Sequence, residues 1–266
     1  MQKSSSRLGG LMLRIAKIAI TRLPQTRNPD IRYNRIMNRL PDPEIVYQQR
    51  GIIVFNKPPG LLTQAPPGID SLELRARQFL TRDDPQTKKI YLTPIHRLDR
   101  PVSGLIVFAR NVRAAKRVSA QFQNRSVLKK YLARVEGRLE ESAGTLENEM
   151  RKIPDEAKSE VVPADHPDAK HAALKYSVRE QGEQATLVEI ELLTGRTHQI
   201  RLQFAHRRNP ILGDSLYGST LPFGKQTIDL RKRQIALHAW RIEFDHPIDD
   251  ERVELTLDPP WSQSLQ

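Results

Sequence analysis

Asp99 is the acidic residue of this chain whose neighbours in sequence are best suited to a catalytic carboxylate. It lies in the polar segment Ile95–Gly104, between Arg97 and Arg100 and just before the apolar run 105–109. A short apolar run bounded by Pro and Gly is typical of a buried strand, so we expect Asp99 in a loop at the lip of a sheet. A carboxylate held among cations stays ionised and oriented, as a nucleophile or general base requires. The simpler interpretation is an Asp that caps a turn and pairs with a neighbouring Arg.

A second segment, 194–202, offers a partner for this carboxylate. Gly195 ends a predicted strand, and Thr197 is expected to cap a helix whose first turn carries Arg201. A guanidinium fixed beside a carboxylate neutralises it without protonating it, and its planar fork sets the direction of the oxygens. In so basic a chain, the alternative for Arg201 is a solvated surface arginine.

Together these segments resemble the RluA-type family of RNA pseudouridine synthases. The motifs that carry the resemblance follow one another along the chain: Asn56–Gly60, His96–Asp99 with Ser103 and Gly104, Lys129–Ala133 with Val135 and Gly137, Gly195–Arg201, Gly213–Gly218, and Leu237–Ala239 leading to Phe244–Pro247. Several ordered motifs over most of a chain are far more specific than any one of them alone.

The resemblance implies that the chain isomerises uridine to pseudouridine in RNA, without a cofactor or a metal. Asp99 would be the catalytic carboxylate, acting as a nucleophile toward the ribose or the base or as the base that removes a ribose proton, and Arg201 would hold it. Tyr131 would stack on the target uracil, whereas a plain core tyrosine is the alternative reading. Arg97 would take part in extruding the nucleotide, which costs a few kcal/mol.

Four further residues complete the expected RNA-binding set. Arg100 adds positive charge to the loop of Asp99, and Lys57 is expected either to contact a phosphate or to be a solvated loop lysine. His96 and His198 are assigned to the architecture of the RNA-binding loops, because neither reaction role requires an imidazole. Val102 stands where the family usually has Thr, and the lost hydroxyl would remove a loop hydrogen bond worth about 1 kcal/mol.

Composition points to a polyanionic partner. The net charge is +12, and residues 1–50 hold ten Lys and Arg against three Asp and Glu. The chain has no cysteine, which excludes disulfides and fits a reducing compartment, and its histidines lack metal-ligand spacing. The sequence contains no run of about 18 apolar residues, so no membrane span is predicted. These features fit a cytoplasmic, monomeric protein that binds no membrane, and the resemblance implies that its partner is ribosomal or transfer RNA.

Two parts are predicted: a basic N-terminal extension, residues 1–42, and a catalytic domain, residues 43–262. The first 29 residues contain no acid, and residues 10–20 can form a short amphipathic basic helix. Three interpretations are open for this segment: an RNA-gripping arm, a transit peptide for import into an organelle, or a helix packed on the body.

The body is predicted to be α+β. Periodicity predicts strands and helices in the following places: strands near 45–47, 52–55, 105–109, 126–137, 173–178, 185–192, 234–244 and 253–257, and helices after Ser71, Asn111 and Thr197. The resemblance implies one large, mostly antiparallel, curved sheet flanked by helices, with the active-site cleft across it. The strand-rich pattern is consistent with that architecture.

Two other functions compete. A catalytically silent RNA-binding or ribosome-assembly factor on the same fold would carry the same charge, but it would not need Asp99, Tyr131 and Arg201 together. A glycoside hydrolase would need two cooperating carboxylates, and no second acidic residue stands in a comparable motif.

Overall fold

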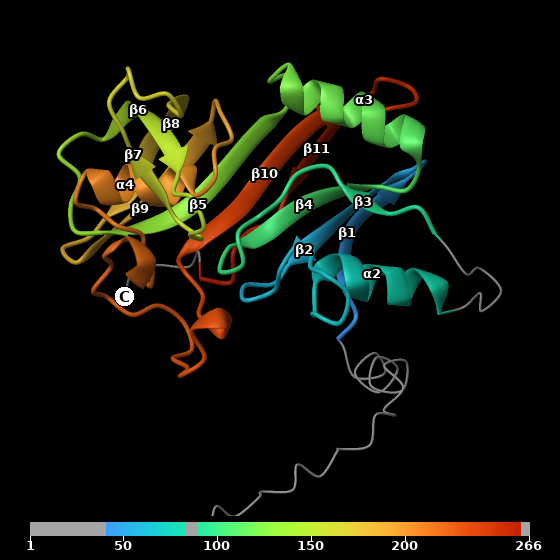
Figure 1. Ribbon diagram of the computed structural model, residues 1–266, viewed down its shortest axis with the longest axis horizontal. Coiled ribbons are helices and arrows are strands. Elements are labelled where there is room, and N and C mark those ends of the chain that lie inside the picture. The colour runs from blue at the N-terminus through green and yellow to red at the C-terminus, as the bar shows by residue number, and fades with distance from the viewer. Residues whose placement is uncertain (1–40, 83–89, 262–266) are drawn as a thin grey trace, which may run out of the picture. The chain divides into compact units, whose positions relative to one another are not determined.

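One mixed sheet forms the body of the protein in a computed structural model that describes residues 41–82 and 90–261 (Figure 1). Within those ranges its eleven strands are β1 Glu44–Gln49, β2 Ile52–Lys57, β3 Thr93–Pro94, β4 Ser103–Ala109, β5 Leu128–Glu136, β6 Ala143–Lys152, β7 Ser159–Val161, β8 Lys170–Gln181, β9 Ala185–Leu192, β10 Leu237–Asp245 and β11 Arg252–Thr256. The predicted α+β class is confirmed. The extension predicted for residues 1–42, with the helix expected at 10–20, lies outside the described residues except for Pro41 and Asp42, so it stays a prediction.

The strand order is β1-β2-β4-β10-β5-β9-β8-β6-β7, with β3 paired to β4 and β11 paired to β10. Among the described strands β4 and β10 pair in parallel, and the other pairs are antiparallel. The parallel contact is very close, because a Cβ on Gly104 would lie 2.4 Å from the Ala239 carbonyl oxygen. Only glycine fits at this point, where φ is +111°.

The described helices are α2 Leu72–Thr81, α3 Val112–Gln123 and α4 Gln199–His206, with short 3₁₀ turns at Ser215–Tyr217 and Leu230–Lys232. Residues 52–55 of β2 explain where two of them pack, because alternate side chains enter opposite layers. Ile53 and Phe55 join the cluster that holds Leu72 of α2, whereas Ile52 and Val54 join the cluster that holds Val118 of α3. A strand buried on both faces reads as a continuous apolar run, and residues 52–55 have that pattern. Figure 1 shows α4 at the other half of the sheet, where it contacts β6 and β7.

Two of the three predicted helix caps are present. The Ser71 hydroxyl accepts the N–H of Leu74 at 3.2 Å, and the Asn111 side-chain oxygen accepts the N–H of Ala114 at 2.8 Å. The cap expected at Thr197 is wrong.

Helix α4 begins one residue later than that cap requires. Its N-cap is His198, in the left-handed region at φ 56°, and no side chain caps it. The side-chain oxygen of Gln199 instead accepts the N–H of Arg196 and the hydroxyl of Thr194. The first residue of the helix therefore bonds back to the loop that precedes it.

No helix of the described residues combines the length and the apolar character needed to cross a membrane.

The loop 95–102, which carries Asp99, is tethered to the segment that follows β2. The Thr63 hydroxyl donates to the Leu98 carbonyl at 3.1 Å and accepts the Leu98 N–H at 3.2 Å, and Gly60 N–H donates to the Arg100 carbonyl at 2.7 Å. At position 102, where a Thr hydroxyl was expected to be missed, the Val102 side chain is 3% exposed and packs in the core.

Lys57 is part of the same tether. Its side chain is fully buried, and Nζ donates to the carbonyls of Leu61 at 2.7 Å, Pro58 at 3.0 Å and Arg100 at 3.2 Å. Burial lowers its pKa to about 7, against the opposing effect of Asp99. Three acceptors match the three protons of an ammonium group. This placement does not fit the phosphate contact expected for Lys57, because the group faces the backbone of two loops.

A buried histidine, His238, joins the start of β4 to the residue that follows β11. His238 Nε2 donates to the Leu257 carbonyl at 2.9 Å, so Nδ1 accepts the Ser103 hydroxyl at 2.8 Å. Burial lowers the pKa of His238 to about 4, so the imidazole is neutral at pH 7.

Replacing Lys57 by Met should destabilise the protein. The variant keeps an unbranched side chain but leaves the carbonyl oxygens of Leu61 and Pro58 without this donor, whereas the Arg100 carbonyl keeps the Gly60 N–H. Each buried group left unpaired costs about 1–3 kcal/mol. We expect the free energy of unfolding, measured by urea denaturation, to fall by roughly 2–4 kcal/mol because relaxation recovers part of the loss. An unchanged unfolding midpoint would contradict the tether.

Stability should fall in acid partly because of His238. The unfolded chain binds this proton near the ordinary histidine pKa of about 6.5, and the folded chain only near 4. The unfolded state therefore holds more protons between these values, and stability decreases as pH falls through that window by at most about 1.4 kcal/mol per pH unit. Urea denaturation of wild type and His238→Gln from pH 7 to pH 4 should show a shallower decline for the variant. His206→Gln, at an exposed histidine, is the control, and parallel curves for wild type and His238→Gln would disprove the contribution.

Candidate active site

Asp99 and Arg201 meet although 102 positions separate them in sequence. Arg201 Nη1 lies 3.2 Å from Asp99 Oδ2, and the Asp99 side chain is 29% exposed. Arg201 is delivered by the first turn of α4, and its side chain is only 5% exposed. The carboxylate thus faces solvent while the guanidinium holds it from behind.

Asp214 is the stronger partner of Arg201, and sequence reasoning did not single it out. Its two oxygens accept Nε at 2.7 Å and Nη2 at 2.8 Å, and it is 2% exposed. This bidentate bond occupies one edge of the guanidinium and leaves Nη1 for Asp99. Burial lowers the pKa of Arg201, but the bonds and charges of Asp214 and Asp99 outweigh it and raise that pKa. The only signal in the sequence was an acid inside the motif 213–218.

Gly213 places Asp214. Its φ is +82°, and a Cβ there would lie 2.8 Å from the Gln234 carbonyl oxygen. A side chain at this position would push the turn away from Gln234 and move the carboxylate that follows it.

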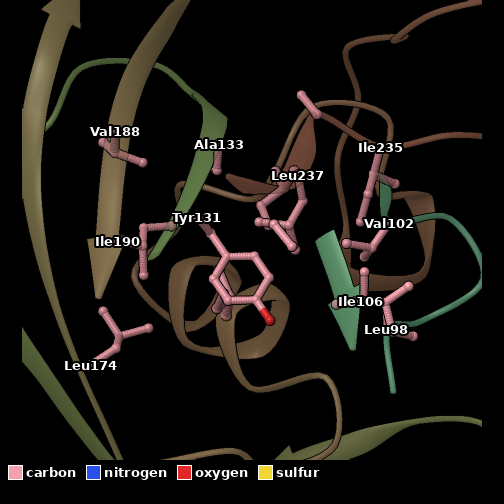
Figure 2. Packing of buried hydrophobic residues seen from close by; sticks show 14 of the residues in the cluster. Leu98, Val102, Ile106, Tyr131, Ala133, Leu174, Val188, Ile190, Ile235 and Leu237 are labelled. Carbon is pink, nitrogen blue, oxygen red and sulfur yellow. The ribbon is translucent and has the colours of Figure 1, made fainter. Parts of the chain in front are cut away.

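Tyr131 belongs to both the core and the cleft. On β5 it is 8% exposed, and it pairs with Ile190 of β9 and Ala239 of β10. Figure 2 shows its ring among Ala133, Ile190 and Leu237. Burial raises the pKa of its phenol, and the charge of Asp99 raises it further, so the ring is neutral. The two readings of Tyr131 are therefore compatible in geometry, because the residue that packs in the core also lines the cavity beside Asp99.

A cleft of about 1480 Å³ opens over Asp99, Tyr131 and Arg201. Among its described lining residues, nine are Lys or Arg and two, Asp99 and Asp214, are acidic. A concave surface lined by one sign of charge concentrates its field and attracts the opposite charge. The ion pair of Asp99 and Arg201 therefore lies in a strongly positive cleft.

The remaining expected RNA-binding residues differ in placement. Arg97 is exposed and lines the cleft, and Arg100 is half-buried in its wall. His96 Nε2 accepts the N–H of Val107 at 3.1 Å, and its ring stacks on Phe122 with centroids 5.0 Å apart. Burial, helped by Lys129, lowers the pKa of His96 to about 3. These contacts fit the architectural role assigned to His96.

His198 touches the carboxylate directly. Its Nε2 lies 3.6 Å from Asp99 Oδ2, and its Nδ1 lies 2.9 Å from the Tyr217 hydroxyl. Sequence reasoning missed Tyr217, which nothing but its place in the motif 213–218 marked.

Comparisons with known proteins agree with this geometry. Residues 51–206 match the family model described as RNA pseudouridylate synthase. The ribosomal large subunit pseudouridine synthase D of Xylella fastidiosa is 37% identical over 229 residues, which cover 83% of this chain and 66% of the relative. The ribosomal large subunit pseudouridine synthase C of Vibrio parahaemolyticus is 30% identical over 251 residues, covering 92% and 74%.

A solved structure, that of human RNA pseudouridylate synthase domain containing 1, is 26% identical with a TM-score of 0.63 and covers 82% of this chain and 84% of that one. The chain spans about two thirds to three quarters of the length of the two bacterial relatives. Because the family model covers more than half of the sequence, and its span contains both Asp99 and Arg201, this chain belongs to the RNA pseudouridine synthases, isomerases that convert uridine in RNA to pseudouridine.

Proposed function

We propose that Asp99 is the catalytic carboxylate of this enzyme and that its substrate is a uridine of ribosomal RNA, turned out of its stack into the cleft. The observation that carries the proposal is the partly exposed Asp99 carboxylate, held by buried Arg201 in a cleft whose described lining has nine Lys and Arg against two acids. The names of the two bacterial relatives support ribosomal RNA as the substrate class.

The reaction breaks the N1–C1′ bond of the uridine and forms a C5–C1′ bond, while C5 loses a proton and N1 gains one. The isomerisation is internally balanced in atoms and electrons. Asp99 contributes an ionised oxygen aimed at the nucleotide, and attack on the ribose or base and removal of a ribose proton all need that oxygen. Arg201 keeps its direction fixed before the substrate arrives, so no reorganisation is needed during the reaction.

The nucleotide must leave its stack to reach Asp99, at a cost of a few kcal/mol. Arg97 is exposed at the cleft, and its planar guanidinium suits the vacated position, where it stacks and donates to phosphates. The Tyr131 ring offers an aromatic face beside Asp99 on which the uracil stacks. Arg100 adds positive charge to the same wall of the cleft.

Asp99→Asn should abolish turnover while RNA binding survives. The amide keeps the shape of the side chain but has neither the charge nor the basicity that the reaction needs, so we expect a loss of at least about 1000-fold. Pseudouridine mapping in transcribed large-subunit ribosomal RNA measures conversion, and filter binding measures affinity. Asp165→Asn, at an exposed acid outside the cleft, is the matched control. Full activity of Asp99→Asn would exclude the catalytic role, and loss of binding together with activity would indicate a structural one.

Arg125 lines the cleft two residues after the end of α3, whereas Arg113 is exposed in the first turn of α3 and lies outside the cleft. If the cleft holds RNA phosphates, Arg125→Gln should reduce the slope of log Kd against log salt by roughly 0.7–0.9, since one phosphate contact is lost. Arg113→Gln should leave the slope unchanged. Equal slopes for the two variants would mean that RNA does not follow this wall.

A further inference from the structure

Two side-chain nitrogens approach the same oxygen of Asp99. Arg201 Nη1 is 3.2 Å from Oδ2, and His198 Nε2 is 3.6 Å from that same atom. Within the described part of the chain, no hydrogen bond reaches Oδ1 from a protein group. The carboxylate is therefore held asymmetrically, with one oxygen engaged and the other open.

Both donors come from the start of α4. His198 is the N-cap and Arg201 lies in the first turn, and both side chains reach the same atom, Asp99 Oδ2. The His198 carbonyl accepts the N–H of Leu202 at 2.9 Å, so the backbone of His198 is fixed to the first helical turn. The two donors thus move with α4 as a unit.

Tyr217 decides which nitrogen of His198 carries the proton. The Tyr217 oxygen accepts the N–H of Ser159 at 2.9 Å, so its own proton is free to be donated. It has two acceptors, His198 Nδ1 at 2.9 Å and the Ser159 carbonyl at 3.4 Å, and the shorter bond is to His198. The opposite tautomer would turn the lone pair of Nε2 toward a carboxylate, which is repulsive.

The imidazole carries a single proton at neutral pH. Burial lowers the pKa of His198, and Arg201 acts in the same direction, against the carboxylates of Asp99 and Asp214. With Nδ1 occupied as an acceptor, that proton is on Nε2 and faces Asp99.

We propose that His198 is a second positioning residue for Asp99: its Nε2–H and the Arg201 guanidinium converge on Oδ2 and leave Oδ1 as the oxygen that meets the uridine. Tyr217 holds His198 in the tautomer this requires. The inference rests on the proposed catalytic role of Asp99, and it goes beyond the architectural role assigned to His198 from sequence. The contact of 3.6 Å is longer than a hydrogen bond, as catalytic contacts often are before substrate binds, and the proposal requires it to tighten in the complex with RNA.

The tautomer is tested without any activity measurement. Protein labelled with ¹⁵N-histidine is observed by long-range ¹H–¹⁵N correlation at pH 7, and the His198 signal is assigned by its absence in His198→Gln. We expect a protonated Nε2 and an unprotonated Nδ1. A proton on Nδ1, or on both nitrogens, would overturn the proposal whether or not the enzyme converts ribosomal RNA.

The positioning role is tested by two substitutions at one site. His198→Ala removes the donor, and we expect the single-turnover rate on ribosomal RNA to fall by roughly 10- to 100-fold, the range expected when a reacting group is misplaced. Its affinity for RNA should stay within about twofold, since the donor faces the carboxylate. His198→Gln restores an N–H near the position of Nε2 and should recover most of the rate.

The outcomes separate this proposal from the function itself. A wild-type rate in His198→Ala, a rate in His198→Gln as low as in the alanine variant, or a loss confined to RNA affinity would each overturn the positioning role. Failure of the proposed function would instead appear as a wild-type enzyme inactive on ribosomal RNA or an active Asp99→Asn. Thermal unfolding of both His198 variants within a few degrees of wild type shows that folding is not the cause.

Discussion

The guanidinium of Arg201 is shared between two carboxylates, and the site depends on how it is shared. Asp214 takes Nε and Nη2 in a buried, bidentate bond, while Asp99 receives only Nη1. If Asp99 were its only partner, the Arg201 guanidinium would turn to bind that carboxylate with two nitrogens. Here the buried carboxylate of Asp214 fixes the plane of the guanidinium instead. Arg201 can therefore direct Asp99 without enclosing it, and the carboxylate stays reachable from the cleft.

The loop that carries Asp99 is held by its neighbours as firmly as Arg201 is held by Asp214. Lys57, Gly60 and Thr63 bond to the backbone of residues 98 and 100, on either side of Asp99. The Ser103 hydroxyl bonds to His238 one strand away. None of these bonds involves the Asp99 carboxylate, so they fix where the carboxylate lies and leave its charge to Arg201. A site held in advance avoids reorganisation when the nucleotide arrives.

Charge is distributed unevenly, and this matters more than the net +12. The described cleft concentrates nine cationic side chains around two acids, although the body as a whole is nearly balanced. A polyanion is therefore attracted to the cleft in which Asp99 is exposed. The charge of Arg201 is balanced by Asp214 in a buried ion pair, so the attraction comes mainly from the other cations of the cleft. The positive cleft and the single accessible carboxylate together suit a reaction on a nucleotide within RNA.

The sequence by itself determined the α+β class, most strands, the caps at Ser71 and Asn111, and the pairing of Asp99 with Arg201. Strands and helix caps were predictable because alternating and helical patterns of apolar residues are local in sequence. The pairing of Asp99 with Arg201 was predictable because the ordered motifs resemble those of a known family. What only the tertiary structure decided are the partners that arrive from elsewhere in the fold. Asp214 on Arg201, Tyr217 on His198 and the burial of Lys57 depend on loops folding over one another, and a lysine or aspartate reads the same in sequence whether it is solvated or buried. Only the packed chain sets the dielectric and the acceptors around each of these groups, and those decide what its charge can do.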